Sequence, residues 1–127
     1  MFKKYPIYPD RVRQVPRQFS WVDQRLVRDS YIERCSHQAA ALYLFLITVS
    51  DAQGLSYYSD QSVQSRLSMD AHTLSQARGE LIHLGLVAYK RPLYQVLPLE
   101  EQSQRSAASQ PQSFATLLRC VMEKAHD

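Results

Sequence analysis

The middle of the chain contains two candidate helices that differ in how their hydrophobic residues are spaced. A Ser-x-x-acid pattern typical of a helix N-terminus begins residues 20–34, so we expect a helix there with Trp21 in the core. Residues 37–52 follow the capping residue Ser36 and are apolar at almost every position. A helix that is apolar all round is normally covered on several sides. We therefore place this second helix, including Leu44, at the centre of the fold.

The next segment has the order strand, helix, tight turn, helix, hairpin. The periodicity predicts strands at 55–58, 86–90 and 93–97 and helices at 59–67 and 70–84, with Gly54 and Gly85 as the left-handed caps that end the preceding helices. This order leaves one helix exposed for a partner surface, usually the major groove of DNA. The sequence thus predicts a mostly α fold with a small β-hairpin, in the α+β class. We expect a winged helix-turn-helix domain over residues 19–99.

The flanking segments have a different composition. Residues 1–18 hold three prolines and follow neither a helical nor a strand period, which predicts an extended arm. Residues 100–112 are rich in Gln and Ser and are expected to be a linker. Residues 113–127 are expected to form an amphipathic helix, and its apolar stripe is the candidate partner-binding surface: Phe114, Leu117, Leu118, Val121 and Met122. The stripe could form a homodimer, fold back or dock on another protein.

The net charge of +3 is distributed unevenly along the chain. Residues 1–18 carry a net charge of +4, residues 19–98 are neutral with seven cations and seven anions, and residues 99–127 carry −1. The arm cations are candidate contacts to DNA phosphates or the minor groove: Lys3, Lys4, Arg11, Arg13 and Arg17. The alternatives are a solubilising tail, or a tail that docks on a protein through Tyr5 and Tyr8.

The helix predicted at residues 70–84 has two distinct faces. At 100° per residue, Leu74, Ala77 and Leu81 fall in one apolar sector that packs on the core. The opposite face and its flanks carry the candidate DNA-reading residues: His72, Thr73, Ser75, Gln76, Gly79 and His83. The alternative is a solvated face on which Gly79 packs against the neighbouring helix. Lys90 and Arg91, at the hairpin tip, are further candidate DNA contacts or an ordinary charged turn.

Other chemistries have little support in the sequence. The two cysteines are far apart, and no spacing of Cys, His or acidic residues indicates a metal site. No phosphate-binding glycine loop or nucleophile motif is present, so we expect neither an enzyme nor a cofactor. The longest apolar run is shorter than a membrane span, and we expect a cytoplasmic protein.

Three short motifs carry a resemblance to a known family over residues 21–97. They are Ala41-Leu-Tyr-Leu-Phe-Leu46, Gly54-Leu-Ser-Tyr-Tyr58 and Leu81-Ile-His-Leu-Gly-Leu-Val87. The segment resembles bacterial winged helix-turn-helix proteins, especially small proteins encoded beside transposase genes and the N-terminal winged domains of replication initiators. The resemblance implies binding to double-stranded DNA.

We therefore expect a sequence-specific DNA-binding protein that reads the major groove with the helix at residues 70–84. It would serve as a transcriptional regulator or as an accessory factor of a mobile element or replicon. The alternative is a winged-helix interaction module that assembles a larger complex and has weak affinity for DNA.

Overall fold

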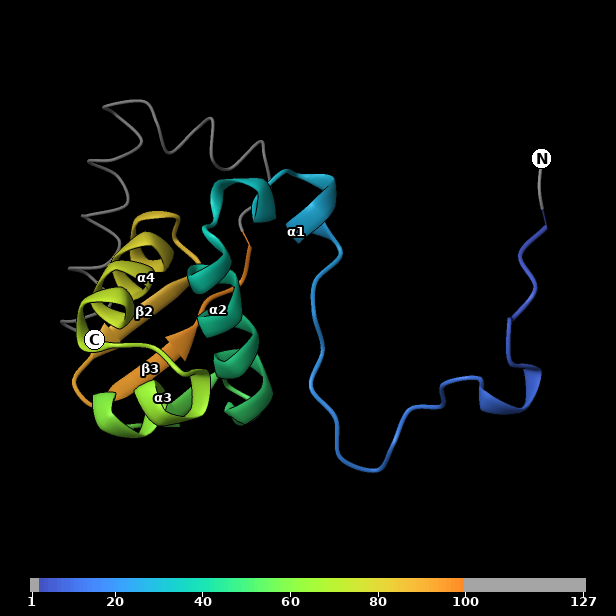
Figure 1. Cartoon of the computed structure of the whole chain (residues 1–127), viewed down its shortest axis with the longest axis horizontal. Coiled ribbons are helices and arrows are strands. Elements are labelled where there is room, and N and C mark those ends of the chain that lie inside the picture. The colour runs from blue at the N-terminus through green and yellow to red at the C-terminus, as the bar shows by residue number, and fades with distance from the viewer. Residues whose placement is uncertain (1–2, 100–127) are drawn as a thin grey trace, which may run out of the picture.

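The computed structural model describes residues 3–99, which contain both α-helices and β-strands (Figure 1). The predicted linker at 100–112 and the predicted helix at 113–127 lie outside the described residues. In chain order the elements are η1 (Pro9–Arg11), α1 (Arg25–Arg28), η2 (Ile32–Arg34), α2 (His37–Val49), β1 (Leu55–Tyr57), α3 (Asp60–Leu67), α4 (Ala71–His83), β2 (Val87–Lys90) and β3 (Leu93–Val96). The α+β class is confirmed, and the arrangement is compatible with a winged-helix-like fold.

Helix α2 begins where the sequence predicts and supplies a large part of the core. The Ser36 hydroxyl accepts a hydrogen bond from the Ala39 amide at 3.1 Å, which confirms the predicted N-cap. The buried side chains of α2 are Ala39, Leu42, Tyr43, Leu46 and Ile47. The prediction for Leu44 is wrong, because this side chain is 60% exposed. One side of α2 therefore faces away from the core even though its residues are apolar.

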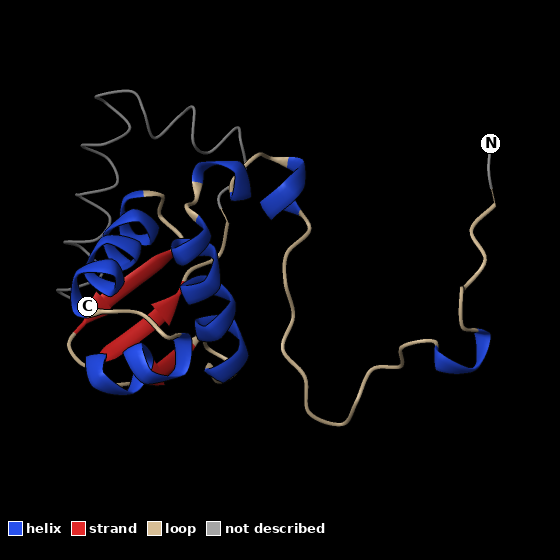
Figure 2. Ribbon diagram, in the orientation of Figure 1, coloured by secondary structure: helices blue, strands red, loops and turns tan. Residues whose placement is uncertain are grey.

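The three strands form one antiparallel sheet with β3 in the middle, in the order β1-β3-β2 (Figure 2). Tyr94 of β3 pairs with Ser56 on one side and Tyr89 on the other, and its side chain is completely buried. The predicted strands and hairpin are confirmed to within two residues at each end.

Gly54 is left-handed, but its predicted role as the cap of α2 is wrong. Helix α2 ends at Val49, and Gly54, with φ of +83°, lies in the turn that leads into β1. The Asp51 carboxylate accepts hydrogen bonds from the amides of Gln53 and Leu55 in this turn. A Cβ on Gly54 would lie 2.6 Å from the Val96 carbonyl oxygen, so glycine is required for β3 to pass this closely.

Helices α3 and α4 and the turn between them follow the sequence prediction closely. Ser59 caps α3 through the Ser62 amide, and Asp70 caps α4 by accepting from the Thr73 amide at 2.7 Å. Ser68 adopts a left-handed conformation that ends α3, and Met69 packs against the core from the turn. Gly85, with φ of +75°, follows α4 as predicted.

The single helix predicted over residues 20–34 is wrong. Its place is taken by two short helices, α1 and η2, separated by Ser30 in a left-handed conformation. The Ser20 hydroxyl caps nothing and instead donates to the Thr48 carbonyl of α2 at 3.2 Å. The start of α1 is held by Asp23, which accepts from the Arg25 amide and pairs with its guanidinium at 2.7 Å. The break after α1 lets both Leu26 and Tyr31 reach the core.

The prediction that Trp21 lies in the core is wrong, because its side chain is 73% exposed. Val22 and Val27 are also exposed. A capping pattern alone does not make a helix, and here the apolar residues after it do not share one face. Core packing in this region comes from Leu26 and Tyr31.

Residues 3–18 extend away from the body of the protein (Figure 1). Every residue in this stretch is exposed, and its regular structure is the three-residue helix η1. Ser20, through its bond to Thr48, is the point at which the extended segment meets α2. Within the described part of the chain, no helix is long and apolar enough to cross a membrane.

Candidate nucleic-acid interface

Helix α4 buries one face and exposes the opposite one, as its sequence predicts. Leu74, Ala77 and Leu81 are at most 1% exposed and pack in the core. The predicted DNA-reading residues that the structure leaves exposed are His72, Ser75, Gln76, Gly79 and His83. Thr73 is half-buried. The predicted residues on this face have hydrogen-bonding side chains, apart from Gly79, which has none.

Ile82 lies on the same exposed side of α4 and was not among the predicted residues. Its side chain is 45% exposed, next to His83. An apolar side chain on a groove-facing helix can contact a thymine methyl group. The helical projection could have identified it, because Ile82 falls about 80° from Leu74 and outside the buried sector.

Gly79 opens onto empty space. In the described part of the chain, a Cβ built at this residue has no atom within 4 Å apart from the neighbouring positions of its own helix. Within residues 3–99, the alternative in which Gly79 packs against the neighbouring helix is therefore wrong. Glycine inside a helix costs roughly 1 kcal/mol relative to alanine, and no internal contact of the described chain explains its presence here.

The N-terminus of α4 is defined by Asp70. The hydrogen bond from the Thr73 amide lowers the pKa of the Asp70 carboxyl, and the nearby His72 side chain acts in the same direction. The carboxylate satisfies one of the free amides at the helix start and complements the helix dipole. The orientation of the first turn, which carries His72 and Thr73, is thereby set.

A hollow of about 510 Å³ lies on the side of α4 that faces the start of α2. Its lining residues are Ser36, Gln38, Thr73, Gln76, Ala77 and Glu80. The Glu80 carboxylate accepts hydrogen bonds from both the amide and the hydroxyl of Ser36, which ties α4 to the N-terminus of α2. Thr73 and Gln76 therefore line a hollow next to the N-terminus of α2.

A cluster around Arg78 holds the other side of α4. The guanidinium donates to the Asp60 carboxylate of α3 and to the Tyr94 hydroxyl of β3, each at 2.8 Å. It also lies over the ring of Tyr89, 4.3 Å from the ring centre. The hydrogen bond from Arg78 lowers the pKa of Asp60, while burial raises the pKa of Tyr94. Arg78 therefore joins α3, α4 and the hairpin.

This cluster was missed by the sequence prediction. Asp60, Arg78 and Tyr94 come from three separate elements, and no local spacing pairs them. The available signal was weak: Arg78 projects at the edge of the buried sector of α4, where a cation needs a partner.

The hairpin tip carries two exposed cations, Lys90 and Arg91. The Tyr58 amide donates to the Pro92 carbonyl at 3.2 Å, which places the tip beside the segment that leads into α3. Asp60 is already paired with Arg78. The tip cations are thus positioned by the body of the protein and remain open to solvent.

The structure does not bring the arm cations to the α4 face. Lys3, Lys4, Arg11, Arg13 and Arg17 are all exposed, and Arg11 lies over the ring of Tyr8 within the arm. In Figure 1 the body of the protein, including α2, separates the arm from α4. A stretch of 16 residues can span roughly 55 Å when fully extended, so the arm can reach far beyond the body of the protein.

Comparisons with known proteins add one likeness. No protein-family model matches the chain, and no curated protein matches it. Among solved structures, the chain is similar to one described as "Structure of Rep-DNA complex", with 18% sequence identity and a TM-score of 0.48. The match covers 68% of this chain and 80% of that chain. At this level of similarity, what the protein does has to be inferred from its own residues.

Proposed function

We propose that the protein is a winged helix-turn-helix protein that binds double-stranded DNA in a sequence-specific manner. Helix α4 is the recognition helix, and the hairpin of β2 and β3 is a short wing. The observation that carries the proposal is the exposed polar face of α4, with Gly79 open to space, beside a hairpin tip that exposes Lys90 and Arg91. The proposed role is that of a transcriptional regulator or an accessory factor of a mobile element or replicon, without catalytic activity.

The side chains on this face match the groups that base edges offer in the major groove. A glutamine such as Gln76 can bond bidentately to adenine, and a histidine such as His72 can donate to guanine N7 or to phosphate. Thr73 and Ser75 can bond either bases or phosphates. Because Gly79 has no side chain, the backbone of α4 can approach the groove closely at its middle.

The distribution of charge along the chain indicates how the domain and the arm would each contribute to DNA binding. Residues 19–98 are net neutral, so the domain alone gains little from phosphate neutralisation. The arm, with a net charge of +4, supplies the favourable electrostatics by lying along phosphates or in a minor groove. In this proposal α4 discriminates between sequences, and the arm strengthens binding to all of them.

Fluorescence anisotropy of the full chain tests both parts of this division. The duplexes would be a random pool and a sequence selected from it by the protein, each at two salt concentrations. We expect His72→Ala and Gln76→Ala each to weaken binding to the selected duplex by roughly 1–3 kcal/mol and to change binding to the random pool little. Replacing the five arm cations with glutamine should instead weaken binding to both duplexes and reduce the salt dependence.

Thr48→Ala is the matched control, because Thr48 is an exposed helical residue on α2, at the point where the arm meets the body. It should leave both affinities unchanged. Equal losses on the selected and random duplexes for His72→Ala and Gln76→Ala would contradict base recognition by α4.

The neutral body is also the observation that favours a second candidate, a winged-helix module that assembles a protein complex. In that case the full chain would bind no duplex even at low salt. A pull-down would recover a protein partner, and its capture would depend on the apolar residues at 114–122. The same anisotropy experiment therefore separates the two candidates.

A further inference from the structure

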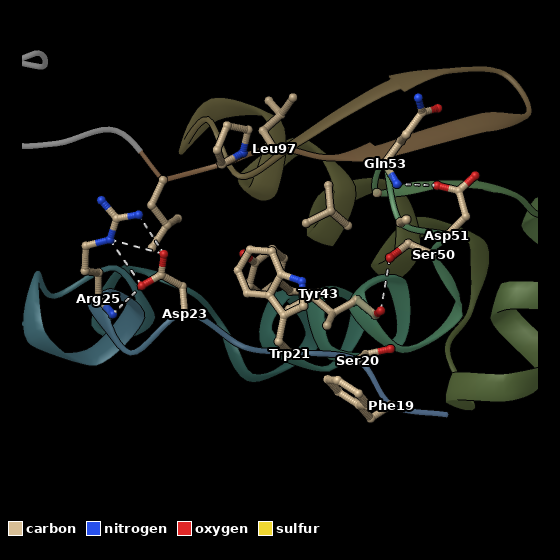
Figure 3. Close-up of a pocket in the computed structure, with 16 residues that line it drawn as sticks. Phe19, Ser20, Trp21, Asp23, Arg25, Tyr43, Ser50, Asp51, Gln53 and Leu97 are labelled. Atoms are coloured by element: carbon tan, nitrogen blue, oxygen red, sulfur yellow. Dashed lines mark hydrogen bonds and ion pairs between the residues drawn. The ribbon is translucent and has the colours of Figure 1, made fainter. Parts of the chain in front are cut away.

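A groove of about 550 Å³ lies where the end of the N-terminal arm and the last described residues, 96–99, come together on the body of the protein (Figure 3). It is formed by residues 19–25, the C-terminal half of α2, the turn at 50–54 and the segment 96–99 that follows β3. Its apolar walls are Phe19, Trp21, Tyr43, Ile47, Leu97 and Leu99. Figure 3 shows Asp23 and Arg25 at one end of the groove and Asp51 and Gln53 at the other.

The charged groups at the two ends of the groove already have partners within the protein. Asp23 is paired with Arg25 at 2.7 Å, and Asp51 accepts from the amides of Gln53 and Leu55. By contrast, two aromatic side chains beside the groove are largely exposed to solvent: Phe19 is 65% exposed and Trp21 is 73% exposed. The groove is thus suited to an apolar occupant that would cover these two rings.

We propose that the occupant is the apolar stripe of the same chain formed by Phe114, Leu117, Leu118, Val121 and Met122. These residues recur at helical spacing, and such a stripe has to be buried against an apolar surface. In helical form the segment from Phe114 to Met122 is about 12 Å long, a length compatible with a groove of this size.

The connection between groove and stripe favours the same chain over a second copy. Leu99 is itself a wall of the groove, and 14 residues separate it from Phe114. A Gln/Ser-rich linker of this length has an average end-to-end distance of roughly 20 Å, enough to bring the stripe back to the groove. Such a tether holds the stripe at an effective concentration of about 1 mM, above that of a separate copy under ordinary conditions.

Trp21 provides a direct test, because it is the one tryptophan in the sequence and it lies in the groove. The measurement is acrylamide quenching and emission wavelength of Trp21 in the full chain. Leu118→Asp places a charge in the stripe and should weaken docking by about tenfold or more. We expect Trp21 to become more accessible to quencher and its emission to move to longer wavelength.

Thr116→Asp is the matched control, because it adds the same charge on the opposite side of the same helical pattern. It should leave Trp21 quenching as in the wild type. A thermal melt followed by circular dichroism checks that both variants keep the folded domain. If Leu118→Asp is insoluble, Leu118→Ser removes the same apolar contact more mildly and should shift quenching in the same direction.

Two results would overturn the proposal. One is that Trp21 is as accessible in the wild type as in Leu118→Asp. The other is that Trp21 accessibility in the wild type depends on protein concentration, which would mean docking of a second copy. DNA binding is measured separately by anisotropy, so failure here leaves the proposed function untouched, and failure of DNA binding leaves this proposal untouched.

Discussion

The Arg78 guanidinium donates a 2.8 Å hydrogen bond to the hydroxyl of Tyr94, whose ring is completely buried in the middle strand of the sheet. This bond fixes α4 against the hairpin from one side, while the bond from Ser36 to Glu80 fixes it against α2 from the other. The exposed face of α4 is consequently held at a defined angle to the hairpin tip. The base recognition proposed for α4 needs this rigidity, because base contacts are lost when the helix can tilt.

We expect Tyr94→Phe to lower the free energy of unfolding by about 0.5–1.5 kcal/mol, because it removes the hydrogen bond and little else. Urea unfolding followed by circular dichroism measures the change. In an Arg78→Met background the same substitution should cost less, since the hydroxyl has already lost its donor there. Tyr57→Phe is the control, because Tyr57 is 72% exposed in β1. Equal effects at the two tyrosines would show that the bond contributes nothing.

The second prediction compares one substitution at two leucines of neighbouring helices. Leu81 of α4 is completely buried, whereas Leu44 of α2 is 60% exposed. Leu81→Asp buries an unpaired charge, at a cost of several kcal/mol against a total stability of about 5–15 kcal/mol, and should abolish the cooperative melt. Leu44→Asp should remain folded and melt cooperatively. Unfolding of the Leu44 variant would mean that this side of α2 is covered.

The sequence predicts these elements well where a capping residue and a hydrophobic period agree. The helices α3 and α4 begin within one residue of the predicted ranges 59–67 and 70–84, because their apolar residues recur on one face, and α2 begins where Ser36 precedes a long apolar run. At Ser20 the cap pattern stands without such a period, and the helix predicted there is absent. The local sequence pattern therefore predicts α2, α3 and α4 correctly, but it predicts the helix after Ser20 wrongly.

The candidate site also has features that the sequence predicts and features that it could not predict. The exposed face of α4 follows from helical geometry and could be predicted residue by residue. The contacts that hold the helix could not, since Arg78 meets Asp60 and Tyr94 from elements far apart in sequence. Nor could the sequence show that Leu44 faces outward, because in an all-apolar helix the period that marks the buried side is missing.

The third prediction concerns acid. The hydrogen bond from Arg78 lowers the pKa of Asp60 below its ordinary value of 3.8, so the folded state binds this proton less readily than the unfolded state. The stabilisation from Asp60 is fully present above the unfolded pKa and is lost as the pH falls through the lower folded pKa. Stability should therefore decline below about pH 4, as followed by urea unfolding at a series of pH values.

Asp60→Asn should lower stability at neutral pH and make its decline in acid shallower, because the group that binds the proton is gone. Asp10→Asn is the control, since Asp10 lies in the exposed arm. It should leave the pH profile of the wild type in place. A profile for Asp60→Asn that parallels the wild type would show that the ion pair does not contribute to acid sensitivity.

The last prediction separates stability from DNA binding at one residue of α4. A Cβ at Gly79 meets no other part of residues 3–99 within 4 Å, so Gly79→Ala introduces no clash with the described part of the free protein. Because alanine favours the helix, the substitution should raise the free energy of unfolding by about 1 kcal/mol. The same methyl group would stand between the α4 backbone and the groove in the proposed complex. We expect affinity for the selected duplex to fall by roughly tenfold, comparable to the loss of one base contact.

Urea unfolding measures the change in stability, and fluorescence anisotropy measures the change in affinity. Thr48→Ala, an alanine substitution on the exposed side of α2, is the control and should leave affinity unchanged. A Gly79→Ala protein that is more stable and binds the selected duplex as tightly as the wild type would show that DNA does not approach this face of α4.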